Sequence, residues 1–584
     1  MAHFNQSFAR YIFHYLNPSP ALQKIGLVST LSLFLAACGG SSSSSSGEIE
    51  PPAPPVVPDD PKVITDDRAA RFLQQASFSS TPQEIQSVKT KGYAAWLDEQ
   101  IAMPIETTGY NWLMVEYLNY YKNDEAKNKA FRETSGTFAV SMMWQQLISQ
   151  PDVLRKRVAL ALSEILVVSL MGIFVPCTSI SVAAYWDILN KHAFGNYQNL
   201  LKDISLSSAM GDFLDIINST KGDPKTGRMP DENYARELLQ LFTVGVVQLN
   251  LDGTPIMVNG RAVETYTNAD ITELAKVFTG LRIDYDKPVS PDVHLKPLAN
   301  KNTASHDMSS KTFLGQTIPA GQDAAKDVES AIAIIFNHPN IAPFVSKQLI
   351  QRLVTSNPSA GYIMRVAQVF NNNGNNVKGD MAAVIKAILL DSEARETVIT
   401  STTGKLREPM VSLVQWARTF TNKTSASTHW QVSTTDDQRG ALAQSPFRAT
   451  SVFNFFAPNY IPSDTSFATN NIVAPEFQLV NEVSVTGYHN YWYYVANRGI
   501  NSNVTSTPEL IPDYSEYVPL IKDPLALVKK LNTVFAAGAL TGKKIAVIAN
   551  AIKGIPETSK DFEKNRMGLA IWLIVISPDY RVQK

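Results

Sequence analysis

The chain has 584 residues, 44% of them hydrophobic and 18% charged, with a formal net charge of −1 at pH 7. This length and composition suit one large folded domain, or two to three average ones, with a sizeable buried core. The balanced charge, without a basic stripe interleaved with aromatic residues, argues against a nucleic-acid partner. Only two cysteines occur, Cys38 and Cys177, so the chain has no disulfide framework.

The first feature along the chain is an apolar run of 13 residues, Ile25–Ala37. It is too short to span about 30 Å of hydrocarbon, but it has the length of a signal-peptide core. The run ends in the letters LAAC, Leu35–Cys38, which resemble the lipobox of bacterial lipoproteins. The resemblance implies a signal peptide over residues 1–37, cleavage before Cys38, and lipidation of Cys38 by diacylglyceryl and a fatty acid such as palmitate. The alternative is an ordinary secretory signal with an incidental cysteine.

Residues 38–63 follow as a Gly/Ser-rich stretch and then a Pro-rich one. Gly and Ser give a flexible coil, and prolines stiffen it toward polyproline II. We interpret this segment as a tether between a lipid anchor at Cys38 and a folded body over residues 64–584. Gly39, in place of an aspartate, implies the outer membrane by resemblance to lipoprotein sorting in Gram-negative bacteria. The predicted location is therefore the cell envelope, with the membrane as a partner through Cys38.

Helical patterns dominate from Asp66 onward, and strand signals are few. The expected fold class is mainly α, a large multi-helix globular domain with one or two small β-hairpins. A division of this body into two subdomains is left open. Helices are predicted over Ala69–Ala76, from Pro82 after a Thr81 cap, over Tyr93–Gln100, Asp152–Leu170, Asn233–Val244 and Asp380–Arg395, and in a last helix that ends at Pro578. Strands are predicted over Gly245–Ile256, around an Asp-Gly turn, and over Lys311–Ile318.

Several segments together resemble the bacterial family known as domain of unknown function 1800. They read RAARFLQQASFSSTPQEIQ, PDENYARELLQLFTVGVVQLNLDG, YTNADITELAKVFTGLR, HDMSSKTFLGQTI, IFNHPNIAPFVSKQLIQRLV and SPFRATSVFNFFAPNY. The resemblance covers nearly everything from about residue 64 onward. It implies a large exported helical protein, often encoded beside a sulfatase-like protein that is a candidate partner. The resemblance gives no information on an activity or a cofactor, so both stay unknown.

The predicted helix Asn233–Val244 carries polar residues on one side, among them Arg236 and Glu237, with Glu232 directly before it. One hypothesis takes Glu232 and Glu237 as metal ligands or acid–base carboxylates held by Arg236. The alternative is structural, because Glu232 and Arg236 have the i, i+4 spacing of an ordinary ion pair and an acid favours a helix N-terminus.

His306 and Asp307 lie side by side before the predicted strand at Lys311. A histidine beside an aspartate can bind a metal, or the aspartate can orient the imidazole as a base. A metal site would need further ligands, which Glu232, Glu237 or His338 could supply. His338 precedes a proline, so a turn histidine is the alternative there.

The helix over Asp152–Leu170 departs from the family pattern. Many relatives carry a Trp-His-Asn-His run where this chain has Leu162–Ile165, which puts in doubt any metal chemistry that relies on those histidines. Glu164 stands alone as a carboxylate in an apolar helix. A buried carboxylate needs a partner or its pKa shifts, and Arg157 on the same face is the expected partner.

The chain contains no nucleophile elbow, no phosphate loop, no HExxH and no paired CxxC. Two hypotheses remain. In the first, the body of a surface lipoprotein acts in binding, assembly or export, with the sulfatase-like neighbour as a partner. In the second, it is a hydrolase that uses Glu232, Glu237, His306 and Asp307 around a metal, for which a carboxylate-rich Ca or Mg site stays open.

Overall fold

The computed structural model describes residues 63–117, 123–124, 136–285, 290–395, 402–421, 430, 432, 434–501 and 508–584. The predicted signal peptide, Cys38 and all of the tether except Val63 lie outside the described residues. Residues 64–584 group into one compact unit.

Three helices begin this body: α3 (Asp66–Ala76), α4 (Pro82–Lys91) and α5 (Tyr93–Ala102). Helix α4 starts with the cap that the sequence predicts. The Thr81 backbone N–H donates to Glu84 Oε2 at 2.8 Å, and the Glu84 N–H donates to Thr81 Oγ1 at 3.3 Å. Helix α3 starts earlier than predicted because Thr65 caps it, accepting a hydrogen bond from the Arg68 N–H at 3.3 Å.

The centre of the body is built around α10 (Val153–Ser163), which is buried on nearly every face. It packs against α5, α9 (Thr137–Ser149), α11 (Thr178–His192) and α17 (Ile341–Leu353). Nearby lie α6 (Gly109–Asn111), a π-helix over Trp112–Tyr117, α12 (Tyr197–Ser205), α13 (Ser208–Phe213) and a 3₁₀ turn over Ile216–Asn218.

The prediction that this central helix continues to Leu170 is wrong. It ends at Ser163 because the backbone beyond makes tertiary hydrogen bonds in place of helical ones. The Leu166 carbonyl accepts from Tyr185 Oη at 2.6 Å, and the Leu170 N–H donates to the Phe447 carbonyl at 2.9 Å. The end of α10 therefore faces other elements of the core.

A second region contains α14 (Asn233–Glu237), a π-helix over Leu238–Thr243, and α15 (Asn268–Ala275). The predicted single α-helix over Asn233–Val244 changes to π geometry halfway, where Thr243 Oγ1 donates to the Leu238 carbonyl five residues back. The remaining elements are short 3₁₀ turns over Lys276–Phe278, Pro291–Leu295 and Thr303–Ser305, and the strands β1 (Met257–Val258), β2 (Arg261–Ala262), β3 (Lys311–Phe313) and β4 (Gln316–Ile318).

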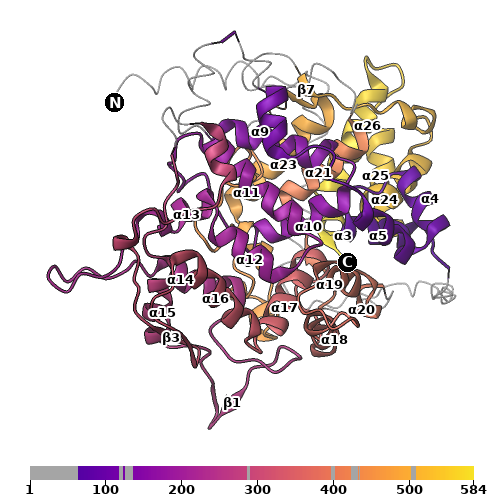
Figure 1. Ribbon diagram of the computed structural model, residues 1–584. Coiled ribbons are helices and arrows are strands. Elements are labelled where there is room, and N and C mark those ends of the chain that lie inside the picture. The colour runs from indigo at the N-terminus through magenta and orange to yellow at the C-terminus, as the bar shows by residue number, and fades with distance from the viewer. Residues whose placement is uncertain are drawn as a thin grey trace. The chain divides into compact units, whose positions relative to one another are not determined.

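The two strand predictions have different outcomes. The hairpin predicted over Lys311–Ile318 is confirmed, with Lys311 opposite Ile318 and Phe313 opposite Gln316. The segment Gly245–Ile256 forms only isolated bridges around its turn, and the strand pair β1–β2 lies just beyond it. This hairpin projects from the body (Figure 1).

The chain then returns toward the centre. It forms α16 (Ala324–Asn337), α17, α18 (Ala360–Asn371), α19 (Met381–Leu390), α20 (Ser392–Arg395), β5 (Lys405–Leu406) and α21 (Pro409–Phe420). The helix predicted over Asp380–Arg395 is capped by Asp380 as expected, but it breaks at Asp391 into α19 and α20.

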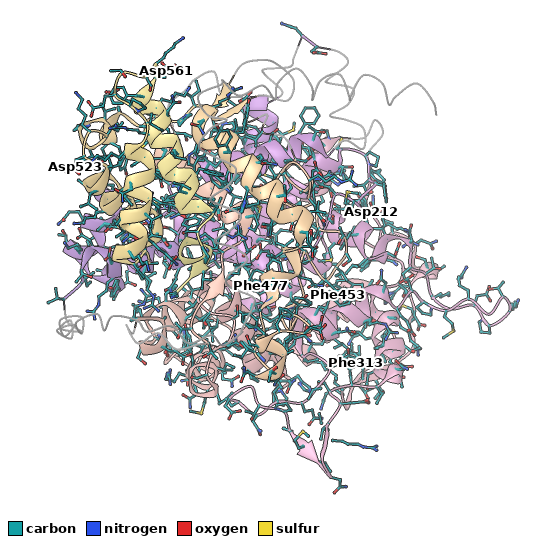
Figure 2. The ribbon with its side chains drawn as sticks, turned by 180° about the vertical axis from the view of Figure 1, so that it is seen from behind. Asp212, Phe313, Phe453, Phe477, Asp523 and Asp561 are labelled. Atoms are coloured by element: carbon teal, nitrogen blue, oxygen red, sulfur yellow. The ribbon has the colours of Figure 1, made fainter. Side chains whose placement is uncertain are left out.

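The C-terminal part consists of α22 (Ser466–Thr469), a 3₁₀ turn over Pro475–Leu479, α23 (Glu482–Arg498), β6 (Ile500–Asn501), β7 (Pro508–Leu510), a 3₁₀ helix over Ser515–Leu520, α24 (Pro524–Ala536), α25 (Gly542–Lys553), α26 (Phe562–Val575), α27 (Pro578–Arg581) and β8 (Val582–Gln583). Asp523 and Asp561, the N-cap residues of α24 and α26, lie at the periphery (Figure 2). Helix α24 packs against α3, so the two ends of the body lie side by side (Figure 1).

Strands β5 and β8 close the body. Lys405 pairs with Gln583 and Leu406 pairs with Val582 in an antiparallel ladder. The described residues hold four two-stranded sheets and are otherwise mostly helical, which confirms the mainly α class. No helix in the described part is both long and apolar enough to span a bilayer.

Candidate functional site

The four predicted metal ligands do not meet. Glu232 lies on the surface between two helices, where its carboxylate accepts from Arg236 Nη2 at 3.1 Å and from Thr272 Oγ1 at 2.7 Å. The i, i+4 ion pair is therefore present, and Glu232 also ties α14 to α15. His338, the further ligand considered, accepts the Asn340 N–H on Nδ1 at 3.1 Å, as a turn histidine does.

Glu237 is the most enclosed of these carboxylates. It is buried, and its Oε2 atom has no hydrogen-bond partner. Burial raises the pKa of Glu237, and the neighbouring charge of Arg236 opposes that shift. The Glu237 carboxylate can therefore still accept a hydrogen bond, but none of the other candidate ligands interacts with it.

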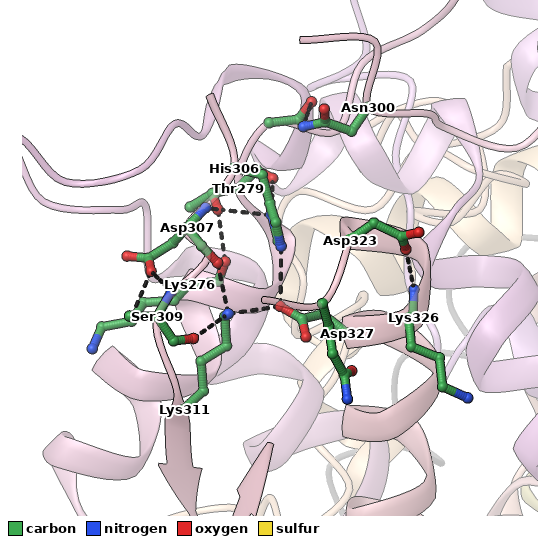
Figure 3. Close-up of polar contacts among 12 residues, drawn as sticks. Lys276, Thr279, Asn300, His306, Asp307, Ser309, Lys311, Asp323, Lys326 and Asp327 are labelled. Atoms are coloured by element: carbon green, nitrogen blue, oxygen red, sulfur yellow. Dashed lines mark hydrogen bonds and ion pairs between the residues drawn. The ribbon is translucent and has the colours of Figure 1, made fainter. Parts of the chain in front are cut away.

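His306 belongs to a buried set of side chains that we call the hairpin cluster: Thr279, His306, Lys311 and Asp327 (Figure 3). His306 Nδ1 lies 2.8 Å from the Thr279 carbonyl, and its Nε2 lies 3.0 Å from Asp327 Oδ2. Both ring nitrogens therefore have a hydrogen-bond partner. Neither nitrogen is left to bind a metal.

Lys311 completes the hairpin cluster. Its ammonium group lies 2.7 Å from Asp327 Oδ2 and donates to the carbonyls of Asp307 and Ser309 at 2.6 and 2.8 Å. All three of its protons are used, which joins the β3–β4 hairpin to α16. The interaction is structural.

Asp307 points away from His306. Its carboxylate accepts from the Ser309 N–H at 2.9 Å and from Ser309 Oγ at 2.5 Å (Figure 3). Burial alone would raise the pKa of Asp307, but these hydrogen bonds outweigh burial and lower it. Within the described ranges, no group of three or more His, Cys, Asp and Glu side chains is placed to hold a metal ion.

The most unusual polar site surrounds Glu164, at the end of α10. The expected partner, Arg157, is not the one that pairs with it. Arg352 Nη1 lies 3.4 Å from Glu164 Oε2, and Arg352 Nη2 donates to the Glu164 carbonyl at 3.2 Å. Arg157 donates to the Arg352 carbonyl at 2.9 Å instead. Because α10 ends at Ser163, the Glu164 side chain reaches α17 rather than the preceding turns of its own helix.

Glu164 and Arg352 are part of a larger buried group. Lys405 Nζ lies 3.0 Å from Glu476 Oε1 and 3.4 Å from Glu408 Oε1. Gln444 Nε2 donates to Glu408 Oε2 at 2.8 Å. We call the charged members the central cluster: Arg157, Glu164, Arg352, Lys405, Glu408 and Glu476, all of them buried.

The two carboxyl groups of Glu164 and Glu408 are hydrogen-bonded to each other. Burial raises the pKa of Glu164 well above its usual range, and the charge of Glu408 raises it further. Burial alone would also raise the pKa of Glu408, but Lys405 and the hydrogen bond from Glu164 outweigh burial and lower it. The pKa values of the two carboxyl groups are therefore shifted in opposite directions, upward for Glu164 and downward for Glu408.

Sequence reasoning identified Glu164 but missed its surroundings. Arg352, Lys405, Glu408 and Glu476 lie 188 or more residues further along the chain, so no local pattern links them to Glu164. The one pointer in the sequence was the segment Ser445–Tyr460, which resembles the family and whose start lies beside this site. Cys177, by contrast, is a buried side chain away from this site's charged residues.

Comparison with known proteins gives one result. The family model described as protein of unknown function (DUF1800) matches residues 71–582. No curated protein and no solved structure matches the chain. The match covers almost the whole folded body, so this chain belongs to the DUF1800 family of proteins of unknown function.

Proposed function

We propose that the protein is a lipid-anchored protein of the bacterial cell envelope, sorted to the outer membrane. The observation that carries this is the order of three segments. The LAAC sequence ending at Cys38 follows an apolar run, a Gly/Ser- and Pro-rich tether comes next, and the compact unit begins at Ile64. Several acyl chains, each contributing about 0.8 kcal/mol per buried methylene, anchor a protein stably at a membrane.

We further propose that the helical body is a binding or assembly module, with the sulfatase-like neighbour as its partner. The β1–β2 hairpin supports this part, because it projects from the body and exposes Met257 and Val258 at 56% and 57% (Figure 1). Their exposure leaves apolar side chains on a projecting element available for contact with a partner.

A metal-dependent hydrolase is the other candidate. It was motivated by Glu232, Glu237, His306 and Asp307, and these residues lie in separate hydrogen-bonded settings. Metal analysis of the purified protein tests it directly. A stoichiometric metal that is lost in both Glu237→Ala and His306→Ala would support the hydrolase over the binding module.

Metabolic labelling with palmitate tests the anchor. The wild-type protein should take up label and sediment with membranes, and Cys38→Ala should lose both properties while its helical circular dichroism stays unchanged. Cys177→Ala is the matched control, because it removes the other cysteine and should keep both properties. Label retained in Cys38→Ala, or an unlabelled wild type, would overturn the proposal.

Co-purification with a sulfatase-like protein, of the kind often encoded beside members of the family, tests the partner. Replacing Met257 and Val258 by lysine should reduce the recovered complex. Met364→Lys changes another exposed methionine, 39% accessible on α18, and should leave recovery unchanged. Equal recovery from both variants would remove the hairpin from the binding surface.

A further inference from the structure

Helices α24 and α25 form a basic region in a chain whose overall charge is balanced. Residues 524–556 contain five lysines and no Asp or Glu, whereas the whole chain has a net charge of −1. The two helices pack against each other and lie at the edge of the body (Figure 1). Protein surfaces ordinarily mix charges of both signs, so this region is suited to a negatively charged partner. The five lysines are Lys529, Lys530, Lys543, Lys544 and Lys553.

Large apolar side chains are exposed among these lysines. On α25, Val547 is 58% exposed and lies one turn after the exposed Lys543. On α24, Leu525 is 44% exposed and lies one turn before the exposed Lys529. Helices that lie on a lipid surface combine the same two kinds of side chain, because the apolar groups reach the acyl chains while the ammonium groups stay at the headgroups. We call this set of side chains the lysine face: Leu525, Lys529, Lys543, Lys544, Val547 and Lys553.

Helix stability does not explain the position of two of these lysines. Lys543 and Lys544 stand in the first turn of α25, just after its N-cap Thr541. The N-terminal end of a helix carries a partial positive charge, which favours acidic residues there and disfavours lysine. The two residues therefore weaken the helix that carries them, and local choices that oppose the fold are expected at functional surfaces.

The acidic groups around the lysine face leave much of its charge unpaired. Asp579 pairs with Lys544. Asp67 accepts a hydrogen bond from a threonine of α24 at 2.8 Å, and Asp523 caps the start of that helix. The remaining lysines of the face form no ion pair with any described residue. Their positive charge is therefore available to a partner.

The lysine face lies beside the start of the body. Helix α3 begins at Asp66, close to Ile64, where the compact unit starts. It packs against α24, and Thr533 of α24 donates to Asp67 in the first turn of α3. With Cys38 in a bilayer, residues 39–63 would be the only covalent link between the lipid and this end of the body. A link of this length gives a high effective concentration of lipid at the face, so weak contacts are enough to bind it.

We propose that the lysine face is a docking surface for an anionic phospholipid bilayer, so that the anchored body lies on the membrane through α24 and α25. This inference rests on the lipid anchor proposed above, because the anchor brings the face to the bilayer. The lysines contact phosphate groups, and Leu525 and Val547 reach the boundary of the acyl chains. Salt screens this attraction, so at physiological ionic strength the face orients an anchored body but does not hold an unanchored one at a membrane.

Vesicle flotation at low ionic strength tests the lysine face without the anchor. The chain produced from residue 38 with Cys38→Ala should bind vesicles that contain phosphatidylglycerol, and about 0.5 M salt should release it. It should bind vesicles of phosphatidylcholine alone about tenfold more weakly or not at all. Adding Lys529→Glu and Lys543→Glu should weaken binding to the anionic vesicles by more than about tenfold, because each lysine contributes about fivefold in affinity. Equal binding to both kinds of vesicle, or binding to neither, would overturn the proposal.

A second pair of substitutions is the matched control. Lys221→Glu with Lys225→Glu makes the same change in net charge at exposed lysines of the loop before α14, on the other side of the body from α25 (Figure 1). This variant should bind anionic vesicles as well as its parent, and circular dichroism should show that both double variants are folded. Equal losses in the two variants would mean that net charge alone drives binding, which would refute the lysine face. Binding to polyglutamate but not to anionic vesicles would assign the face to an acidic protein instead.

A fluorescent label shows whether the apolar part of the face reaches the lipid. The chain has only two cysteines, so Val547→Cys in a chain with Cys38→Ala and Cys177→Ala carries a single label. The emission of an environment-sensitive dye at this position should shift to the blue on anionic vesicles. The same dye on Lys225→Cys should not shift. An unshifted emission at position 547 would contradict contact between the face and the acyl chains.

The lipid anchor and the lysine face can fail separately. Palmitate label on the wild-type protein, without vesicle binding by the unlipidated chain, would overturn only the lysine face. Vesicle binding by the unlipidated chain, without palmitate label on the wild-type protein, would overturn only the anchor.

Discussion

Two buried charge clusters in this protein look similar in composition but differ in how well they are satisfied. In the hairpin cluster, His306 and Lys311 use every donor they have, and only Asp327 Oδ1 lacks a partner among its charged side chains. In the central cluster, atoms of Arg157, Glu164 and Glu476 lack partners. A small cavity adjoins the second cluster.

The difference teaches that burial and charge alone do not mark a functional site. A set of side chains whose hydrogen bonds are complete joins elements of the fold and has little left for a ligand. A set that leaves donors and acceptors unused beside a cavity of this size can take up a buried water. The two clusters therefore differ in how many of their hydrogen-bonding atoms have partners, rather than in residue type.

The largest expected effect is in the hairpin cluster. Asp327→Asn leaves His306 and Lys311 buried without a counter-charge, so it should lower the free energy of unfolding by about 3–5 kcal/mol. Urea denaturation measures this loss. The control is Glu329→Gln on the exposed face of the same helix, where the ion pair with Lys326 is in solvent and its loss should change little. Equal midpoints for both variants would show that the cluster does not stabilise the fold.

The next largest effect is in the central cluster, where the free energy of unfolding should depend on pH through Glu164. The pKa of Glu164 is higher in the folded state than its ordinary value of 4.5, so the folded state binds the proton more tightly. The contribution of Glu164 to the free energy of unfolding is therefore fully present below about pH 4.5. It is lost as pH rises toward the folded pKa, with a slope of at most about 1.4 kcal/mol per pH unit.

Glu164→Gln should remove this dependence, and urea denaturation at a series of pH values above 4.5 measures it. Ser412→Ala is the control, because it changes a buried polar residue next to Glu408 without removing a titratable group. The idea fails if Glu164→Gln keeps the full slope of the unsubstituted protein.

The smallest expected effect is at the surface pair Glu232–Arg236. Their side chains are 36% and 41% exposed, so Arg236→Ala should cost only about 0.3–0.5 kcal/mol in the free energy of unfolding. Arg236→Lys keeps the positive charge, so its free energy of unfolding should lie between those of the unsubstituted protein and Arg236→Ala. A loss of about 2 kcal/mol or more would instead mean that Arg236 supports the buried carboxylate of Glu237.

Local patterns predicted much of the fold. The Thr81 cap, the helix over Tyr93–Gln100 and the hairpin over Lys311–Ile318 all depend on neighbours a few residues apart, and all three are confirmed. The predicted helix end at Leu170 was wrong because tertiary hydrogen bonds, which no local pattern shows, set the actual end. The helix predicted over Asn233–Val244 ends where expected but changes to π geometry at Leu238.

The candidate site could be predicted only in part. Glu164 was recognisable as a carboxylate in an apolar helix, which requires a partner. Its partner Arg352 is 188 residues away, and Glu408 lies at the start of another helix. Such pairs form through packing, so their identity depends on the whole fold. The same holds for His306, whose neighbour in sequence, Asp307, turns away from it while Asp327 faces it.

The strand pair β5–β8 has a consequence for how the body folds. Lys405 of the central cluster is positioned opposite Gln583, and Arg71 of α3 donates to the Lys584 carbonyl at 2.7 Å across 513 positions of sequence. Contacts this distant in sequence form slowly, and here they join the start of the body to its end. A chain still being synthesised cannot complete this interior, so the body must be held unfolded or partly folded until residue 583 is available.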